Sequence, residues 1–282
     1  MIKALSTEYR VQELCEALAV SPSGYYEWAG RKPGKRQEAN QELAQKIQLV
    51  YADSRKTYGS PRIALTLQKQ GVACGRKRVA RLMKQNDIQG AQKARYKPRT
   101  TDSNHDLPIS PNRLSELPAV ERINQVWVGD ITYIPTLEGW MYLAAFMDLK
   151  SRKIKGWTIR DHMQTSLVND AFSKAVFQEG PIPGLITHTD RGCQYASREF
   201  QALLSQHHVL GSMSAKGNCY DNAAMESFWA TLKTDMRIVK PFKTKEDARR
   251  AVFDYIETFY NRFRLHSALG CSPLDYENQL VA

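Results

Sequence analysis

The sequence feature that most constrains the fold is a series of three strand patterns in quick succession. Residues 126–134 (VWVGDITYI), 140–148 (WMYLAAFMD) and 153–160 are rich in β-branched and aromatic residues, and short turn sequences separate them. Strands joined by such short turns pair antiparallel. We therefore expect an antiparallel meander at the start of the larger folding unit.

Helix and strand patterns alternate after this meander. Helices are predicted at 166–178, 197–207, 222–235 and 246–262, and strands at 185–189 and 209–213, with a polar loop at 214–221. This order predicts an α/β fold with a mixed five-stranded sheet and flanking helices.

The first hundred residues have a helical character instead. Amphipathic helix patterns cover 8–19, 38–52, 61–70 and 76–86. A turn at 21–24 is expected to end the first helix, with Tyr25, Tyr26 and Trp28 as aromatic anchors. The proline-rich stretch 91–118 has linker composition. We expect four parts: an N-terminal helical segment 1–36, a helix-turn-helix-like module 37–97, a linker 98–122, and an α/β core with C-terminal helices 123–282.

Basic side chains are concentrated in one part of the helical region. The chain has 40 Lys and Arg against 29 Asp and Glu, a net charge of +11, and residues 51–100 alone contain 13 basic and two acidic residues. A polyanion is the expected partner of that stretch, because binding relieves self-repulsion and releases counterions. The alternative is a solvated basic face without a partner.

A helix-turn-helix pattern lies within this basic stretch. In its second helix, Val79, Leu82 and Met83 are expected to face inward, and the outward basic side chains are Arg76, Lys77, Arg78, Arg81 and Lys84. A basic helix after a short glycine-containing turn is typical of helices that enter the major groove of DNA. An ordinary helical hairpin is the alternative.

Composition argues against several other classes of protein. The five cysteines form no CxxC pair, which argues against a disulfide framework or a cysteine-rich zinc site and indicates a reducing cytoplasm. No apolar run approaches the roughly 18 residues of a membrane helix. No secretory leader is expected at the start of the chain.

Three acidic residues are candidates for a metal site. Asp130 lies inside an apolar strand, where a carboxylate is costly to bury unless it is paired or binds a cation. Asp190 follows the strand at 185–189, and Glu226 lies one turn into the helix at 222–235. Each of these acids alone is as compatible with a structural salt bridge as with a metal site. Together, oxygen ligands without cysteine or clustered histidine favour Mg²⁺ or Mn²⁺, and two such ions promote phosphodiester displacement.

The helix at 222–235 carries further candidates. Asn222, Glu226 and Lys233 fall on one face, which places Lys233 to contact a phosphate near the metals; a surface salt bridge is the alternative. His188, Asn222 and His266 are second-tier candidates. We favour structural roles for His188 and His266, with DNA contact as the alternative for His266, and Asn222 is a candidate helix cap.

Several ordered words of the sequence resemble a known family. They are YGSPRI at 58–63, RVARLM at 78–83, WVGDITYI at 127–134, HTDRGCQY at 188–195, SMSAKGNCYDNAAMESFWATLK at 212–233 and YNRFRLHSALG at 260–270. The chain resembles the second-frame (orfB) transposases of a large bacterial insertion-sequence family, which are related to retroviral integrases. The resemblance runs from roughly residue 12 to 276.

The resemblance implies a ribonuclease H-like core with a DDE triad of Asp130, Asp190 and Glu226 that binds Mg²⁺ or Mn²⁺, with Lys233 two helical turns beyond Glu226. It implies metal-dependent cleavage at the inverted-repeat ends of an element, then strand transfer, without a covalent protein–DNA intermediate. The implied partners are double-stranded DNA, further copies of the chain and an upstream-frame (orfA) protein or fusion, in a bacterial nucleoid. Asp235 departs from the family's LKxE ending, which leaves its local contacts open.

Two other classes of protein remain compatible with these residues. A structure-selective nuclease on the same fold would cut DNA without joining it. A non-catalytic DNA-binding regulator of transposition would use the three acids structurally.

Overall fold

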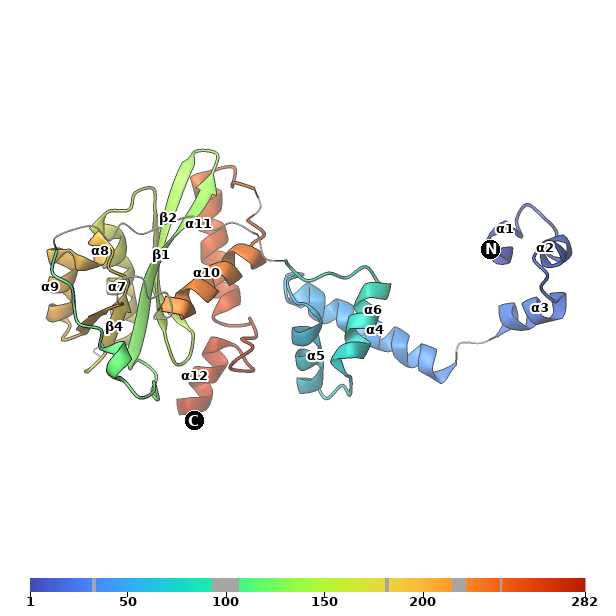
Figure 1. The fold of residues 1–282 in the computed structure, drawn as a ribbon, viewed down its shortest axis with the longest axis horizontal. Helices are drawn as coiled ribbons and strands as arrows, with labels where there is room; N and C mark the ends of the chain where they lie inside the picture. The colour runs from blue at the N-terminus through green and yellow to red at the C-terminus, as the bar shows by residue number, and fades with distance from the viewer. Residues whose placement is uncertain (32–33, 93–106, 181–182, 215–221, 239, 282) are drawn as a thin grey trace.

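The computed structural model describes residues 1–31, 34–92, 107–180, 183–214, 222–238 and 240–281. A group of short helices is followed by a three-helix module and then by an α/β unit built on one sheet (Figure 1). The short helices are α1 (Ile2–Leu5), α2 (Val11–Ala17) and α3 (Pro22–Gly30).

The prediction of a turn at 21–24 was wrong, because these residues form the start of helix α3. The Ser21 hydroxyl caps the helix by accepting a hydrogen bond from the Gly24 backbone N–H at 3.5 Å. Pro22 follows at the first helical position, where a missing N–H costs little. Tyr26 and Trp28 are each 58% exposed, so they are not buried anchors.

The three-helix module confirms the predicted helix-turn-helix pattern. It consists of α4 (Lys35–Asp53), α5 (Ser60–Lys69) and α6 (Arg76–Gln85). Ile47, Ile63, Leu67 and Val79 are completely buried in its core. Because Leu82 and Met83 are buried with them, the charged side of α6 faces outward.

The sheet of the α/β unit has five strands in the order β3-β2-β1-β4-β5. The antiparallel meander consists of β1 (Val126–Thr136), β2 (Gly139–Asp148) and β3 (Ile154–Arg160). Two parallel strands extend it, β4 (Ile186–Thr189) and β5 (Leu210–Met213). Helices lead to both: α7 (Thr165–Glu179) precedes β4, and α8 (Cys193–Ala196) and α9 (Arg198–Gln206) precede β5. The predicted α/β class and mixed five-stranded sheet are confirmed.

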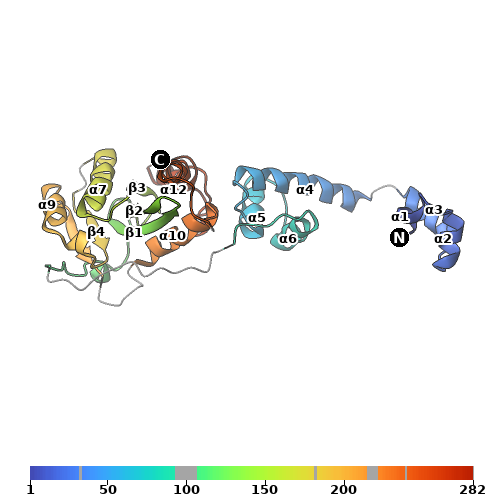
Figure 2. The ribbon, with the colours of Figure 1, turned by 90° about the horizontal axis from the view of Figure 1, so that it is seen from above.

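Helices cover both faces of the sheet (Figure 2). On one face, α7 and α9 enclose a core that includes Trp127 and Phe146. On the other, α10 (Ala223–Asp235) and α11 (Lys245–Phe253) enclose a core that includes Val126 and Val128. Since side chains alternate along a strand, the even-numbered positions at the start of β1 face α10.

The chain beyond α11 differs from the single helix expected at 246–262. Helix α11 passes into a π-helical segment, Asp254–Tyr260, and α12 (Pro273–Val281) follows later, without having been predicted. Directly after the π-helical segment, the Asn261 amide donates to the Ile154 carbonyl at 3.0 Å and accepts from the Ile154 N–H at 2.9 Å. These bonds close part of the edge of β3, which would otherwise leave backbone groups unpaired.

A 3₁₀ helix, η1 (Leu114–Glu116), precedes the sheet. Within the described ranges, no helix is both long enough and apolar enough to cross a membrane.

Strand β3 passes α7 so closely that Gly156 has no room for a side chain. A Cβ there would lie 2.3 Å from the Ala171 carbonyl oxygen and 2.6 Å from the Ala175 backbone nitrogen. We expect Gly156→Ala to lower the free energy of unfolding by about 1–3 kcal/mol through overpacking, as measured by urea denaturation. Gly30→Ala in the last turn of α3 is the control, because nothing lies within 4 Å of its Cβ position. Equal stability of the two variants would contradict the close packing.

Candidate active site

Asp130 lies in β1 on the face that α10 covers. Its Oδ1 accepts a hydrogen bond from the Ile131 backbone N–H at 2.8 Å, and its Oδ2 accepts one from the Trp229 indole N–H at 3.0 Å. Trp229 belongs to α10. The strand and the helix together therefore fix the orientation of this carboxylate.

Asp190 is the first residue after β4 and lies beside Asp130. Strands β1 and β4 are parallel, with Val128 paired to His188, and the same register two residues on brings Asp130 next to Asp190. The Asp190 Oδ1 accepts a hydrogen bond from the Gly192 backbone N–H at 2.9 Å. Parallel pairing thus brings together two acids that are far apart in the sequence.

Glu226 lies in the first turn of α10, which packs against β1. Trp229 and Lys233 follow three and seven residues later and share its side of the helix. Glu226 is exposed, whereas Trp229 is buried. The buried tryptophan therefore anchors the helix to Asp130, and the exposed glutamate has room to change rotamer.

The three carboxyl groups interact electrostatically. The pKa of Asp130 is raised to about 7, first by burial and then by the negative charge of Asp190, while Glu226 adds a smaller effect in the same direction. The hydrogen bonds from Ile131 and Trp229 oppose this rise. Burial lowers the pKa of Lys233, and attraction to Asp130 raises it, which places this cation within electrostatic reach of the acids.

The carboxylates are suited to a divalent metal ion, although they do not enclose one in this conformation. Across the described parts of the chain, no three His, Cys, Asp or Glu side chains are grouped as ligands. Asp130 and Asp190 nevertheless offer adjacent carboxylate oxygens whose mutual repulsion a cation would relieve. Residues 215–221, which lead into α10, lie outside the described ranges.

Two residues that bind the aspartates, and a tyrosine within electrostatic reach of them, were not identified from the sequence. Trp229 and Gly192 donate the hydrogen bonds described above. Tyr195 is 1% exposed, and burial followed by the charges of Asp130 and Asp190 raises the pKa of its hydroxyl. The one sequence feature that could have identified Trp229 as a site residue is its helical spacing from Glu226 and Lys233. This feature is weak, because a buried tryptophan is usually part of a core.

The second-tier candidates lie around the site without joining the carboxylates. His188 is buried on β4, and its Nδ1 lies 2.8 Å from the Ser212 Oγ on β5, which fits the structural role expected for it. Asn222 occupies the N-cap position of α10, but its side chain makes no capping hydrogen bond. His266 lies among Arg152, Arg264 and Arg62 rather than among the acids.

Asp235, the residue that departs from the family pattern, has a structural role. It is almost completely buried and forms an ion pair with Arg264. The Tyr255 hydroxyl donates a second hydrogen bond to it at 2.9 Å. Asp235, at the end of α10, is therefore one half of a buried ion pair with Arg264.

The basic residues of α6 are not all equivalent. Arg76, Lys77, Arg81 and Lys84 are exposed. Arg78 is only half-exposed, because its guanidinium donates to the Asn40 Oδ1 at 2.9 Å and to the Ala39 carbonyl at 3.2 Å. The outward direction expected for Arg78 was thus only partly right, since this side chain lies against α4.

Family models match three parts of the chain. An integrase core domain model matches residues 120–219, a second model of the same description matches 226–281, and an HTH-like domain model matches 38–96. The chain is 38% identical, over its whole length and 98% of the relative, to the transposase InsF for insertion sequence IS3A of Escherichia coli (strain K12). The chain belongs to the integrase-core transposases of insertion sequences.

Other relatives agree with this assignment. The transposase for insertion sequence element IS904 of Lactococcus lactis is 42% identical over 88% of this chain and 98% of its own length. The insertion element IS600 uncharacterized 31 kDa protein of Shigella sonnei is 40% identical, with 91% and 94% covered. This transposase is accordingly an enzyme of the polynucleotidyl transferase type.

Two solved structures are more distant. The HTLV-2 integrase catalytic core domain in complex with magnesium is 18% identical, with a TM-score of 0.42, over 54% of this chain and 95% of that one. A chain of the simian T-cell lymphotropic virus intasome is 15% identical, with a TM-score of 0.48, over 82% and 73%. The family models and the sheet order, rather than these likenesses, establish the fold of the transposase.

The raised pKa of Asp130 predicts a pH-dependent cost to stability. The pKa is about 7 in the folded chain against an ordinary value of 3.8. The folded state therefore holds this proton longer than the unfolded state does, and stability falls as the pH rises from about 4 to about 7. Asp130→Asn removes this fall in stability, because the asparagine side chain does not ionise. We expect the variant to be more stable than wild type by roughly 2–4 kcal/mol above pH 7, and by little at pH 4.

Urea denaturation with a chelator at several pH values measures this difference. Glu199→Gln, which changes an exposed acid on α9, is the matched control and should show no such pH dependence. A stability difference for Asp130→Asn that does not change with pH would contradict the prediction.

Proposed function

We propose that Asp130, Asp190 and Glu226 are the catalytic residues of this transposase and ligate Mg²⁺ or Mn²⁺, as two ions. The main support is the adjacency of Asp130 and Asp190 beside the parallel pairing of β1 and β4, where the charge of Asp190 adds to the effect of burial in raising the pKa of Asp130. Glu226 completes the ligand set from the helix that also supplies Trp229. When bound, such ions stabilise the charge on phosphodiester oxygens and acidify the attacking hydroxyl.

The residues of the chain orient the reaction. Ile131 and Trp229 each bind one oxygen of Asp130, and Gly192 binds Asp190, so neither aspartate can rotate without losing a hydrogen bond. The proposed role of Lys233 is to bind a DNA phosphate beside the acids, and its electrostatic interaction with Asp130 supports this role.

The proposed chemistry has two displacement steps. A water oxygen first attacks the phosphorus at the end of the element, and the 3′ oxygen leaves as a hydroxyl. That hydroxyl then attacks a phosphodiester of the target, joining the element end to the target's 5′ phosphate, while the target's own 3′ oxygen leaves and takes up the proton as a hydroxyl. Direct displacement without a covalent protein–DNA intermediate is supported by the burial of Tyr195, whose hydroxyl is near the aspartates but inaccessible to DNA.

We further propose that the four parts of the chain divide the work. The module 37–97 holds double-stranded DNA, the element ends and the target, through Arg76, Lys77, Arg81 and Lys84, with Arg78 in a lesser role. The core 123–282 carries the chemistry, and 1–36 and the linker 98–122 connect and extend the module. Because two ends must be paired, the working form contains at least two copies of the chain. An upstream-frame (orfA) partner or fusion and a location at the bacterial nucleoid complete the proposal.

Neutral substitutions in the triad test the catalytic assignment. We expect Asp130→Asn, Asp190→Asn and Glu226→Gln each to lower the rate of cleavage and of strand transfer by at least about 10³-fold, as expected when a metal ligand is lost, with DNA binding retained. The assay follows end-containing DNA with Mg²⁺, and Glu199→Gln is the control. Metal-dependent joining by Asp190→Asn would refute the triad. Cutting without joining by wild type would indicate a structure-selective nuclease instead.

The salt dependence of DNA binding tests the role of α6. We expect Arg81→Gln to reduce the slope of log affinity against log salt by about 1, because one phosphate contact is lost. Fluorescence anisotropy with end-containing duplex at several salt concentrations measures the slope. Lys46→Gln on α4, also an exposed cation, should leave it unchanged. Equal slopes for wild type and Arg81→Gln would count against α6 as the binding surface.

A further inference from the structure

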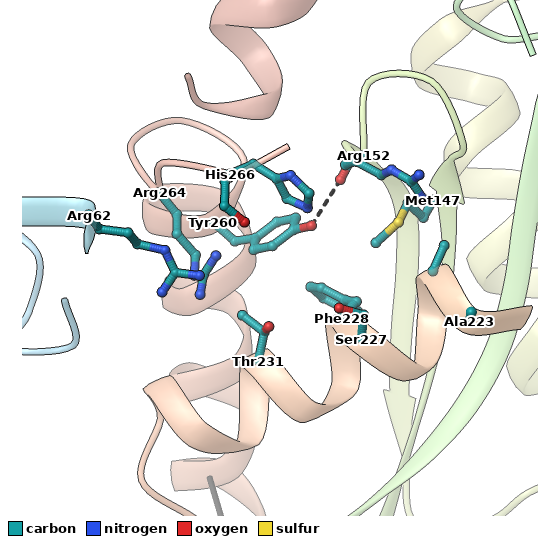
Figure 3. A pocket seen from close by; sticks show the side chains of 12 residues that line it. Arg62, Met147, Arg152, Ala223, Ser227, Phe228, Thr231, Tyr260, Arg264 and His266 are labelled. Carbon is teal, nitrogen blue, oxygen red and sulfur yellow. Dashed lines mark hydrogen bonds between the residues drawn. The ribbon is translucent and has the colours of Figure 1, made fainter. Parts of the chain in front are cut away.

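A basic pocket lies beside α10, apart from the carboxylates (Figure 3). It has a volume of about 290 Å³, and its walls come from α5, α10, the turn after β2 and the segment that follows the π-helical turn. Arg62 and Arg264 enter from one side, with their guanidinium groups close together, Arg152 lies on the opposite side, and His266 lies between the two sides near Tyr260 (Figure 3). Arg62 belongs to α5 of the three-helix module, which is the HTH-like module. This module thus supplies one wall of a pocket in the α/β unit, which we propose to be the catalytic unit.

The pocket has more positive charge than its own acids neutralise. Arg264 is paired with Asp235. Neither Arg62 nor Arg152 has an acidic partner within 4.0 Å in the described part of the chain, and the buried Nε of Arg62 has no hydrogen-bond partner there. Among the described residues, these two guanidinium groups therefore line the pocket without a salt bridge of their own, and only Asp235, at longer range, acts on Arg62 with an opposite charge.

The neutral groups of the pocket can donate hydrogen bonds. Burial and the charges of Arg152, Arg264 and Arg62 lower the pKa of His266 to about 4, so its imidazole is neutral at physiological pH. The buried Nδ1 of His266 has no partner among the described residues. Ser227 and Thr231 add hydroxyl groups from the pocket side of α10. Guanidinium, imidazole and hydroxyl groups around a small cavity are the donors that phosphate oxygens accept.

We propose that this pocket binds one phosphate group of the DNA backbone, held by Arg62 and Arg152 together with the donors of α10 and His266. The proposal rests on the proposed function, because it takes DNA as the ligand. Ser227 directly follows Glu226, so α10 would contact the same DNA from two sides. A phosphate held by Arg62 and Arg152 would also link the HTH-like module to the catalytic unit.

Arg152→Gln tests the phosphate contact. We choose Arg152 over Arg264, which is paired with Asp235, and over Arg62, which lies over the Tyr58 ring. The Arg152 side chain has no ion pair among the described residues, and its backbone carbonyl, which accepts a hydrogen bond from the Tyr260 hydroxyl, is kept. With a chelator present, we expect the variant to lose about 0.9 from the slope of log affinity against log salt. Arg198→Gln on α9, an exposed arginine on the other face of the sheet, should keep the wild-type slope. An unchanged slope for Arg152→Gln overturns the proposal.

The imidazole resonances of His266 provide a second readout. End-containing duplex should shift them in wild type and fail to do so in Arg152→Gln, whereas the same duplex should still bind the variant through α6. Absence of a shift in wild type overturns the proposal, as does a shift caused by inorganic phosphate but not by duplex, which would indicate a free-anion site. Since both measurements report binding without metal, they are independent of whether Asp190→Asn abolishes cleavage.

Discussion

The parallel pairing of β1 with β4 is the constraint on which the rest of the structure depends. It places Asp130 and Asp190 side by side, and burial, followed by the negative charge of Asp190, raises the pKa of Asp130 to about 7. Such an arrangement destabilises the fold locally unless a cation is bound. The apolar cores on both faces of the sheet offset this cost, and Trp229 connects one of them directly to Asp130.

The junction between the HTH-like module and the catalytic unit is a second organising element. The Leu265 backbone N–H donates to the Tyr58 hydroxyl at 2.6 Å, Arg55 forms an ion pair with Asp254, and Arg237 donates to the Lys56 carbonyl at 3.0 Å. These contacts hold the turn between α4 and α5 against the α/β unit. They therefore decide that Arg62 completes the basic pocket, although it belongs to the DNA-binding module in sequence.

The sequence predicted most elements of the α/β unit within a few residues, because their apolar periodicity is local. It predicted 126–134 and 166–178 where β1 (Val126–Thr136) and α7 (Thr165–Glu179) lie. The predictions were wrong where a local pattern is compatible with two structures, or where the structure involves contacts distant in sequence. Ser21 and Pro22 suit a turn as well as a helix start. The π-helical segment is directly followed by Asn261, whose bonds to Ile154 of β3 join residues far apart in the sequence and are not encoded by local periodicity.

The sequence alone determined the family, the α/β class and the identity of the acids that we propose as catalytic, because these depend on residue type and order. Only the tertiary structure decided which groups act on one another. It bound Trp229 to Asp130, assigned Asp235 to Arg264, turned Arg78 toward α4, and set Arg62 beside Arg264. Each of these contacts joins segments distant in sequence, and the packing of helices on strands, rather than any local pattern, fixes where such side chains meet.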